Sequence, residues 1–105
     1  MQVLSLLTNV REIKHAVVSD LAGTLLESMG ESDAETIGAV MGYTAAAMNE
    51  VGAALGLGDL QRISYAGKTQ SCVVTMLDEN VVATFIDPST SVAAVEKKID
   101  GAFRR

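Results

Sequence analysis

The most chemically reactive side chain types in this 105-residue chain occur once each, as His15 and Cys72. A histidine acts as a general base only beside a positioned partner, and neither a cysteine nor a pair of carboxylates stands near His15 in the sequence. Cys72 lies in an alternating run with Val74 and Met76, which is typical of a small buried hydrophobic residue. We therefore expect a surface or packing role for His15 and a buried packing role for Cys72. A single cysteine also allows neither an internal disulfide nor a multi-cysteine metal site.

The carboxylates and glycines add no catalytic motif. Ser19-Asp20 and Glu27-Ser28 flank an expected turn, and solvated hairpin ends explain them better than a catalytic pair. The glycines match neither G-x-x-x-x-G-K-S/T nor a G-x-G-x-x-G loop after a strand, because Gly56-x-Gly58 follows a helix. The sequence therefore predicts no catalytic residue, cofactor site or metal site, and no enzymatic activity.

Arg62 lies in the strand expected after the long helix and allows two interpretations. It could reach into a bound nucleotide-hydrolysing protein as an arginine finger, which stabilises the charge of the transition state. It could also be a solvated strand arginine, which is how most arginines occur. The sequence favours the second interpretation, because the other arginines of the chain are equally unconstrained.

Composition and charge indicate one small intracellular domain, residues 1–105. The chain is 49% hydrophobic but only 4% aromatic, which predicts a core of aliphatic side chains. The net charge of -5 repels a phosphate backbone, so nucleic acid is not an expected partner. The N-terminal stretch has no basic leader or cleavage site of a signal peptide, and the single cysteine fits a reducing compartment. We therefore expect a cytoplasmic protein.

The order of elements follows from apolar spacing and turn residues. A short N-terminal helix is expected from apolar residues at three- and four-residue steps, namely Val3, Leu4, Leu6, Leu7 and Val10. AVVSDL and TLLESMG around Ala22-Gly23 predict a hairpin, while LQRISYAG, QSCVVTML and VVATFID predict three further strands. Ser32 and Glu35 have capping-box spacing, so a long helix is expected to begin there. Gly56 and Gly58 supply its left-handed end.

A final helix follows Pro88, with capping residues at 89–91 and an apolar stripe of Val92, Val95, Ile99 and Phe103. The order is thus α-β-β-α-β-β-β-α. It predicts an α/β (α+β) sandwich, in which a five-stranded antiparallel sheet has the long helix on one face and the two terminal helices on the other.

The long helix carries two neighbouring rows of residues with identical spacing. The bulky row consists of Ile37, Met41, Thr44, Met48, Val51 and Leu55. The glycine row consists of Gly38, Gly42, Ala45, Asn49, Gly52 and Gly56. A glycine inside a helix costs about 0.8 to 1 kcal/mol relative to alanine, so a row of them indicates a closely packed neighbour.

This helix also lacks the charged outer face of a surface helix. From Thr36 to Gly58 the only ionisable side chains are Glu50 and Tyr43. If one row packs on the sheet, the other can pack on the same helix of a second copy, which predicts a homodimer. The alternative is that the twist of the sheet and nearby loops cover both rows. A membrane span is not expected, because polar residues and glycines interrupt the stretch and no basic cluster flanks it.

Three segments resemble the roadblock/LC7 family over nearly the whole chain: VVSDLAGTLLES, SDAETIGAVMGYTAAAMNEVGAALGLGDL and SCVVTMLDENVVATFIDP. The resemblance implies a profilin-like fold and pairing through the long helix and the following strand, here Ile37 to Leu55 and Leu60 to Ala66. Pairing would also protect that strand, which is otherwise an exposed edge. The expected dimer-interface residues are Ile37, Gly38, Met41, Gly42, Ala45, Met48, Asn49, Gly52, Leu55, Arg62 and Ser64.

The resemblance implies a function as well. Members of this family scaffold or regulate nucleotide-hydrolysing partners, such as dynein motors, Rag GTPase complexes and bacterial Ras-like Mgl-type GTPases, and several do so without a catalytic residue of their own. In the bacterial gliding system the dimer promotes hydrolysis by rearranging a GTPase that docks on the helical face. Two rival hypotheses are a small-ligand sensor on a profilin-like or PAS-like sandwich and a plain structural subunit. The low aromatic content argues against the sensor.

Overall fold

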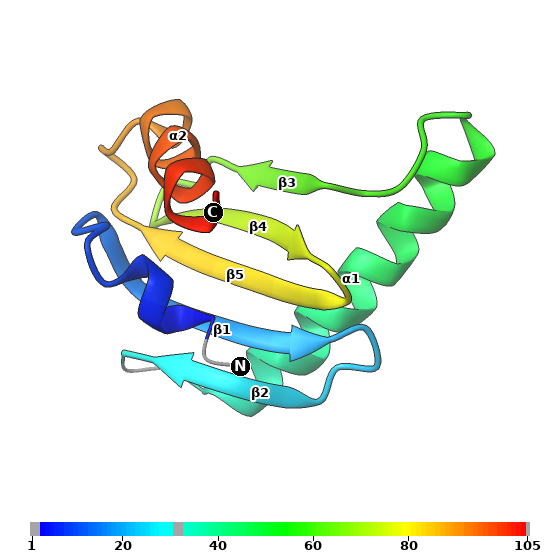
Figure 1. The fold of residues 1–105 in the computed structure, drawn as a ribbon, viewed down its shortest axis with the longest axis horizontal. Helices are drawn as coiled ribbons and strands as arrows, with labels where there is room; N and C mark the ends of the chain where they lie inside the picture. The colour runs from blue at the N-terminus through cyan, green and yellow to red at the C-terminus, as the bar shows by residue number, and fades with distance from the viewer. Residues whose placement is uncertain (1–2, 31–32, 105) are drawn as a thin grey trace.

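The computed structural model describes residues 3–30 and 33–104. Its elements occur in the predicted order (Figure 1). They are η1 (Leu4–Leu7), β1 (Ile13–Asp20), β2 (Leu25–Met29), α1 (Ala34–Ala54), β3 (Arg62–Tyr65), β4 (Ser71–Leu77), β5 (Asn80–Ile86) and α2 (Val92–Phe103).

The first helix differs from the expectation in type, because η1 is a 3-10 helix rather than an α-helix. Val3, Leu4, Leu7 and Val10 are buried, whereas Leu6 is only half-buried. The N–H of Leu6 donates to the carbonyl of Val3 at 3.0 Å, which is the i to i+3 hydrogen bond of a 3-10 helix. The buried side chains belong to the core that η1 shares with α2.

The five strands form one antiparallel sheet, as predicted from the sequence, and their order in the sheet is β2-β1-β5-β4-β3. β2 and β3 are the two edges. β1 carries a bulge between Val18 and Ser19, where its pairing with β2 shifts register. The three inner strands read as nearly continuous apolar runs, because they are covered on both faces.

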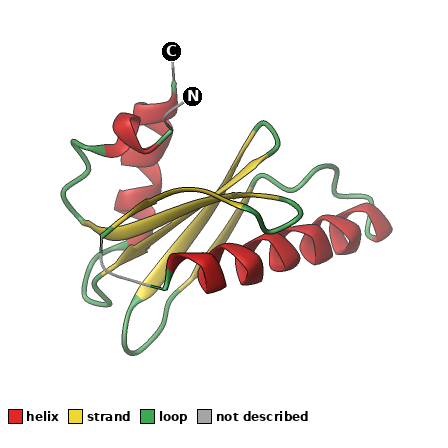
Figure 2. Ribbon diagram, turned by 90° about the horizontal axis from the view of Figure 1, so that it is seen from below, coloured by secondary structure: helices red, strands yellow, loops and turns green. Residues whose placement is uncertain are grey.

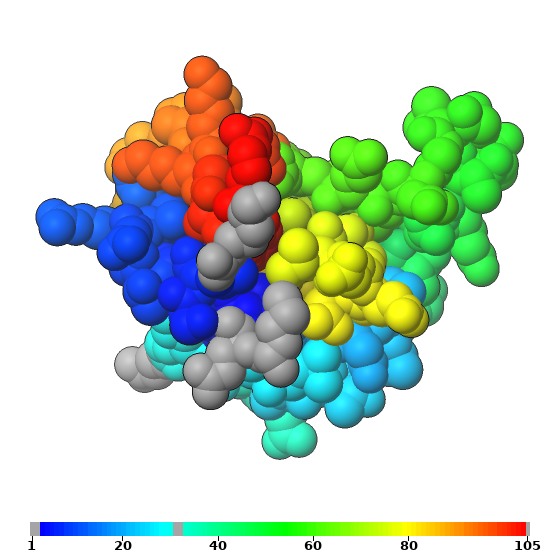
Figure 3. Space-filling view, viewed as in Figure 1, coloured from blue at the N-terminus to red at the C-terminus, as the bar shows by residue number. Residues whose placement is uncertain are grey.

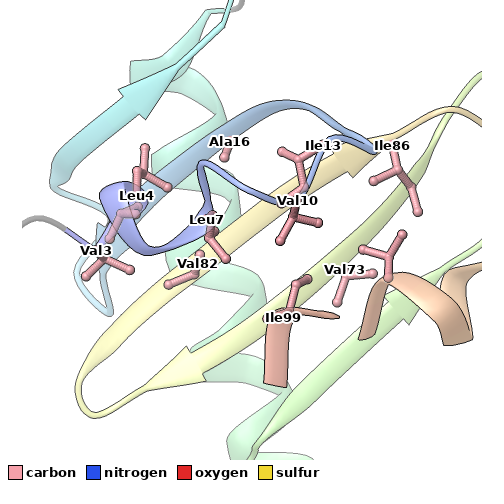
Figure 4. Close-up of a cluster of buried hydrophobic side chains, with 12 residues drawn as sticks. Val3, Leu4, Leu7, Val10, Ile13, Ala16, Val73, Val82, Ile86 and Ile99 are labelled. Carbon is pink, nitrogen blue, oxygen red and sulfur yellow. The ribbon is translucent and has the colours of Figure 1, made fainter. Parts of the chain in front are cut away.

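Two hydrophobic cores lie on opposite faces of the sheet. On one face, η1 and α2 cover a cluster that includes Leu7, Val82 and Ile99 (Figure 4). On the other face, α1 covers a smaller cluster around Ala45, Val81 and Ala83. Figure 2 shows the resulting layers, with α1 on one side of the sheet and the terminal helices on the other. The predicted sandwich is confirmed.

Both ends of α1 use local hydrogen bonds and glycine geometry. The expected N-cap Ser32 lies outside the described residues, and the observed N-cap is Asp33, which accepts hydrogen bonds from the backbone N–H and the hydroxyl of Thr36. At the other end, Gly56 and Gly58 adopt φ of +72° and +87°. The N–H of Leu57 donates to the carbonyl of Gly52 at 2.8 Å. The predicted left-handed end of this helix is confirmed.

The residues that flank the first turn have structural roles. Asp20 Oδ1 accepts hydrogen bonds from the backbone N–H groups of Ala22 and Thr24, which closes the turn. Glu27 accepts from the N–H groups of Val3 and Leu4 at 2.7 and 2.9 Å, so a β2 carboxylate caps the start of η1. Ser19 is fully buried. The interpretation of these positions as solvated hairpin ends is therefore wrong for Ser19 and Glu27.

The long helix crosses the sheet and then leaves it. α1 contacts β1, β2 and β5, and its C-terminal end extends past the strands (Figures 1 and 2). In the space-filling view this end and the loop after it stand away from the rest of the molecule (green, right; Figure 3). Within residues 3–30 and 33–104, no helix has the length and apolar character needed to cross a membrane.

Candidate interaction surface

The glycine row of α1 packs on the chain's own sheet over its first half. Gly38, Gly42 and Ala45 are buried, and Ala45 has no exposed surface. A Cβ at Gly38 would lie 3.5 Å from the Cβ of Ser19 on β1. These three positions are covered by the chain's own sheet and turn, so they do not belong to the exposed surface that we propose below for a second copy. The closely packed neighbour that the glycines indicated is within the same chain.

The closest approach of α1 to the sheet is at the β1–β2 turn. A Cβ at Gly42 would lie 2.7 Å from the Cα and N of Gly23, and 2.9 Å from the carbonyl oxygen of Asp20. Gly23 itself adopts φ of +88°, a conformation that favours glycine. Two glycines thus let helix and turn meet backbone to backbone.

The second half of the glycine row holds the loop that returns to the sheet. Asn49 Oδ1 accepts a hydrogen bond of 2.8 Å from the N–H of Leu60. A Cβ at Gly52 would lie 3.2 Å from the carbonyl oxygen of Gly58. Asn49 and Gly52 therefore both contact the chain's own loop after α1, although Asn49 remains exposed at the surface.

The bulky row is covered only at its start. Ile37 and Met41 are half-buried and pack against the core on the α1 face. Farther along, Met48 and Leu55 are 41% and 67% exposed, and Val51 is also exposed. The alternative in which sheet and loops cover both rows is therefore wrong. We call residues 55–58, the C-cap of α1 and the start of the loop after it, the tip; its second large side chain, Leu57, is 73% exposed.

An apolar groove opens on the α1 face where α1 leaves the sheet uncovered. It has a volume of about 320 Å³. Met41 and Thr44 of α1 form one wall, and the strands form the floor. The remaining lining residues are Ile63, Tyr65, Gln70, Cys72, Val74 and Phe85. We call this feature the open groove. It lies at the Tyr65 end of β3, whereas the tip precedes the Arg62 end.

The cysteine in the open groove is not a nucleophile. Cys72 is 9% exposed, and burial raises the pKa of its thiol to about 12. At neutral pH almost no thiolate is present, and the thiolate is the form that reacts. The predicted burial of Cys72 is confirmed, and its low reactivity stays a prediction.

We expect Cys72 of the folded protein to resist alkylation by iodoacetamide at pH 8, because both access and ionisation are low. In denaturant the same thiol should react at the rate of a free cysteine peptide, a difference of about two orders of magnitude or more. Mass spectrometry of timed samples measures both rates. Rapid labelling of the folded protein would contradict the assigned environment.

His15 on β1 lies opposite Phe85 on β5, and Phe85 is one of the residues that line the open groove. Its ring stacks on Phe85, with centroids 4.5 Å apart and an interplanar angle of 19°. Burial lowers the pKa of His15, which favours the neutral ring at pH 7. The expected packing role of this histidine is confirmed.

The two polar residues of β3 point away from the open groove. Arg62 forms an ion pair with Asp100 of α2 at 2.6 Å, and Ser64 donates a hydrogen bond to Glu96 of α2. Arg62 is therefore neither a solvated strand arginine nor free to act as an arginine finger. This ion pair could not be predicted from local sequence patterns, because 38 positions separate its two residues.

The described residues, 3–30 and 33–104, contain no group of three or more His, Cys, Asp or Glu side chains that could hold a metal ion. The surface features of the α1 face are thus an apolar tip, an apolar groove and an edge strand. Such features suit contact with another protein more than chemistry on a small molecule.

Comparison with known proteins identifies the family. The family model described as the Roadblock/LC7 domain matches residues 1–87. The chain belongs to the roadblock/LC7 family. Among curated proteins, none matches its sequence.

Solved structures share the fold of this roadblock/LC7 chain. Myxococcus xanthus MglB is 22% identical with a TM-score of 0.83, over 93% of this chain and 82% of that one. A roadblock/LC7 domain from Streptomyces avermitilis is 15% identical with a TM-score of 0.79, over 93% and 85% of the two chains. Acanthamoeba castellanii profilin IB is 12% identical with a TM-score of 0.64, over 92% and 90%. The profilin-like fold implied by the sequence is therefore confirmed.

Proposed function

We propose that this roadblock/LC7 protein is a non-catalytic homodimer that scaffolds or regulates a small Ras-like GTPase or another nucleotide-hydrolysing protein in the cytoplasm. The observation that carries the dimer is the presence, on one face of the molecule, of an exposed apolar tip and an open apolar groove. The partner class is carried by family membership. The two parts of the proposal are tested separately.

The tip and the open groove suit reciprocal pairing. They lie on the α1 face at opposite ends of the edge strand β3. A two-fold axis normal to the sheet at this edge would exchange the two ends of β3. It would therefore bring the tip of each copy over the open groove of the other, so that the same contact forms twice.

The edge strand supports the same arrangement. β3 has four residues and pairs only with β4, so its other side offers unpaired backbone groups. Two such edges can pair antiparallel and join the sheets. The exposed half of the bulky row, Met48 to Leu55, would then lie near the same axis and lose its contact with water.

A partner protein would still find an apolar surface on such a dimer. The outward side of α1 carries Val40 and Tyr43, which are 50% and 77% exposed, with Glu50 two turns beyond Tyr43. These residues belong to neither the tip nor the open groove. We propose this outward side as the place where the regulated GTPase docks.

A small-ligand sensor has less support. At about 320 Å³ the open groove is at the low end of ligand sites, and its lining offers few polar groups to orient a small molecule. A leucine side chain from a second copy fits that lining better.

The partner class is tested by co-purification from the native host with a non-hydrolysable GTP analogue and, in parallel, with GDP. We expect a small GTPase to be recovered in one nucleotide state in preference to the other, and Tyr43→Ala to reduce recovery at least fivefold by removing apolar contact. Leu26→Ala, an exposed apolar residue on the opposite edge of the sheet, is the matched control. Recovery of no GTPase in either nucleotide state would contradict the proposed partner class. It would not bear on the proposed dimer, which is tested separately by light scattering.

A further inference from the structure

We infer that α2 holds the edge strand β3 in position for pairing and thereby sets the strength of the dimer. The contact consists of Arg62 and Ser64 on β3 with Asp100 and Glu96 on α2, and we call it the latch. The inference rests on the proposed function, since β3 is the edge through which two copies are proposed to pair.

The latch has the geometry of a strong polar contact. Arg62 Nη2 donates to Asp100 Oδ1 at 2.6 Å and Nη1 donates to Oδ2 at 3.3 Å, so the ion pair is bidentate. Nη2 also lies 3.4 Å from the hydroxyl of Thr75 on β4. The Arg62 side chain is only 22% exposed. Charge-assisted bidentate contacts of this kind fix orientation as well as adding stability.

β3 has little other support on its open side. Among the described residues its four residues pair only with β4. On the α1 face Ile63 packs against the core cluster around Ala45, and Tyr65 lines the open groove and is 68% exposed. The two residues that point to the opposite face, Arg62 and Ser64, are both bound to α2. α2 therefore accepts side-chain hydrogen bonds from both residues of β3 that point to this face, and Arg62 alone also reaches Thr75 of β4.

α2 is itself firmly attached, so it can act as the fixed side of the latch. Val95 and Ile99 are fully buried in the core shared with η1, and Lys98 pairs with Glu12 before β1. The helix begins after residue 87, the last one that the family model matches. A segment beyond the matched family domain thus restrains the strand through which that domain is proposed to pair.

The latch is tested with Asp100→Asn, using Glu12→Gln as the matched control. Each variant removes one carboxylate charge from an ion pair of α2 on the same face, but only Asp100 contacts β3. We expect Asp100→Asn to raise the dimer dissociation constant roughly three- to fivefold and Glu12→Gln to leave it unchanged. The difference should shrink at high salt, because Asp100 is half-exposed and its ion pair is screened.

Hydrogen exchange of the backbone amides of β3 gives a second readout that does not need the dimer. At protein concentrations above the dimer dissociation constant and well below it, Asp100→Asn should speed amide exchange in residues 62–65, and Glu12→Gln should not. In a double-mutant cycle, Arg62→Gln and Asp100→Asn should be non-additive, since either one breaks the same ion pair. Equal effects of Asp100→Asn and Glu12→Gln on both readouts would overturn the inference.

The outcome also separates the latch from the dimer. If the unmodified protein is a monomer at every concentration, the dimer proposal fails. Exchange in β3 then decides the latch alone: faster exchange in Asp100→Asn than in Glu12→Gln supports restraint by α2, and equal exchange overturns it.

Discussion

We expect replacement of Leu55 and Leu57 of the tip with lysine to convert the proposed dimer into a monomer at micromolar concentration. The two leucines are 67% and 73% exposed in the single chain. Burial of one leucine contributes about 1.5 to 3 kcal/mol, and the two-fold arrangement buries each twice. Allowing for incomplete burial, the dissociation constant should rise by about three orders of magnitude.

The fold itself should tolerate the double substitution. Leu55 is the C-cap of α1, where a lysine interacts favourably with the negative end of the helix dipole. The matched control replaces Leu21 and Leu26 with lysine; these leucines are 41% and 48% exposed at the β1–β2 hairpin, which forms the opposite edge of the sheet. Light scattering should give twice the 11.0 kDa chain mass for the unmodified protein and the control. A dimeric tip variant would refute the pairing of tip and groove.

The local parts of the fold could be predicted because each depends on neighbours in the sequence. The apolar, β-branched runs along 71–77 and 80–86 between turn residues predicted strands, and Gly56 and Gly58 predicted the end of α1 through their left-handed geometry. The 3-10 helix was missed because apolar steps of three and four residues are the pattern of an α-helix. The backbone hydrogen bond from the N–H of Leu6 to the carbonyl of Val3 distinguishes the two helix types, and the apolar pattern does not show it.

The orientation of α1 could not be predicted, because its two rows have the same spacing and both are apolar. What decides it is the contact between Gly42 and Gly23, two residues 19 positions apart in different elements. Because the backbone of the β1–β2 turn contacts the helix directly, only the glycine row can face it. The latch was missed for the same reason, since the partner of Arg62 is Asp100, near the end of the chain.

Gly42→Ala should destabilise the folded protein, whereas Gly101→Ala should stabilise it. Both substitutions remove a glycine from a helix, which by itself favours folding by about 0.8 to 1 kcal/mol. At Gly42 the added Cβ would lie 2.7 Å from the Gly23 backbone, and backbone can move only with the whole β1–β2 turn. Overpacking of this kind costs about 1 to 3 kcal/mol, enough to reverse the gain. At Gly101 the new methyl group would meet no atom of the described residues within 4 Å, apart from its chain neighbours and its own helix backbone.

The pair of variants therefore isolates the helix–turn contact. We expect the free energies of unfolding of Gly42→Ala and Gly101→Ala to differ by about 2 kcal/mol, with opposite signs relative to the unmodified protein. For a chain of this length the melting temperatures should differ by roughly 8 to 16 °C. Urea and thermal unfolding must be compared at one protein concentration, because dimer formation shifts both. Since Gly42 is buried in its own chain, the destabilisation should persist in the monomeric tip variant. Its disappearance there would show that Gly42 packs against a second copy after all.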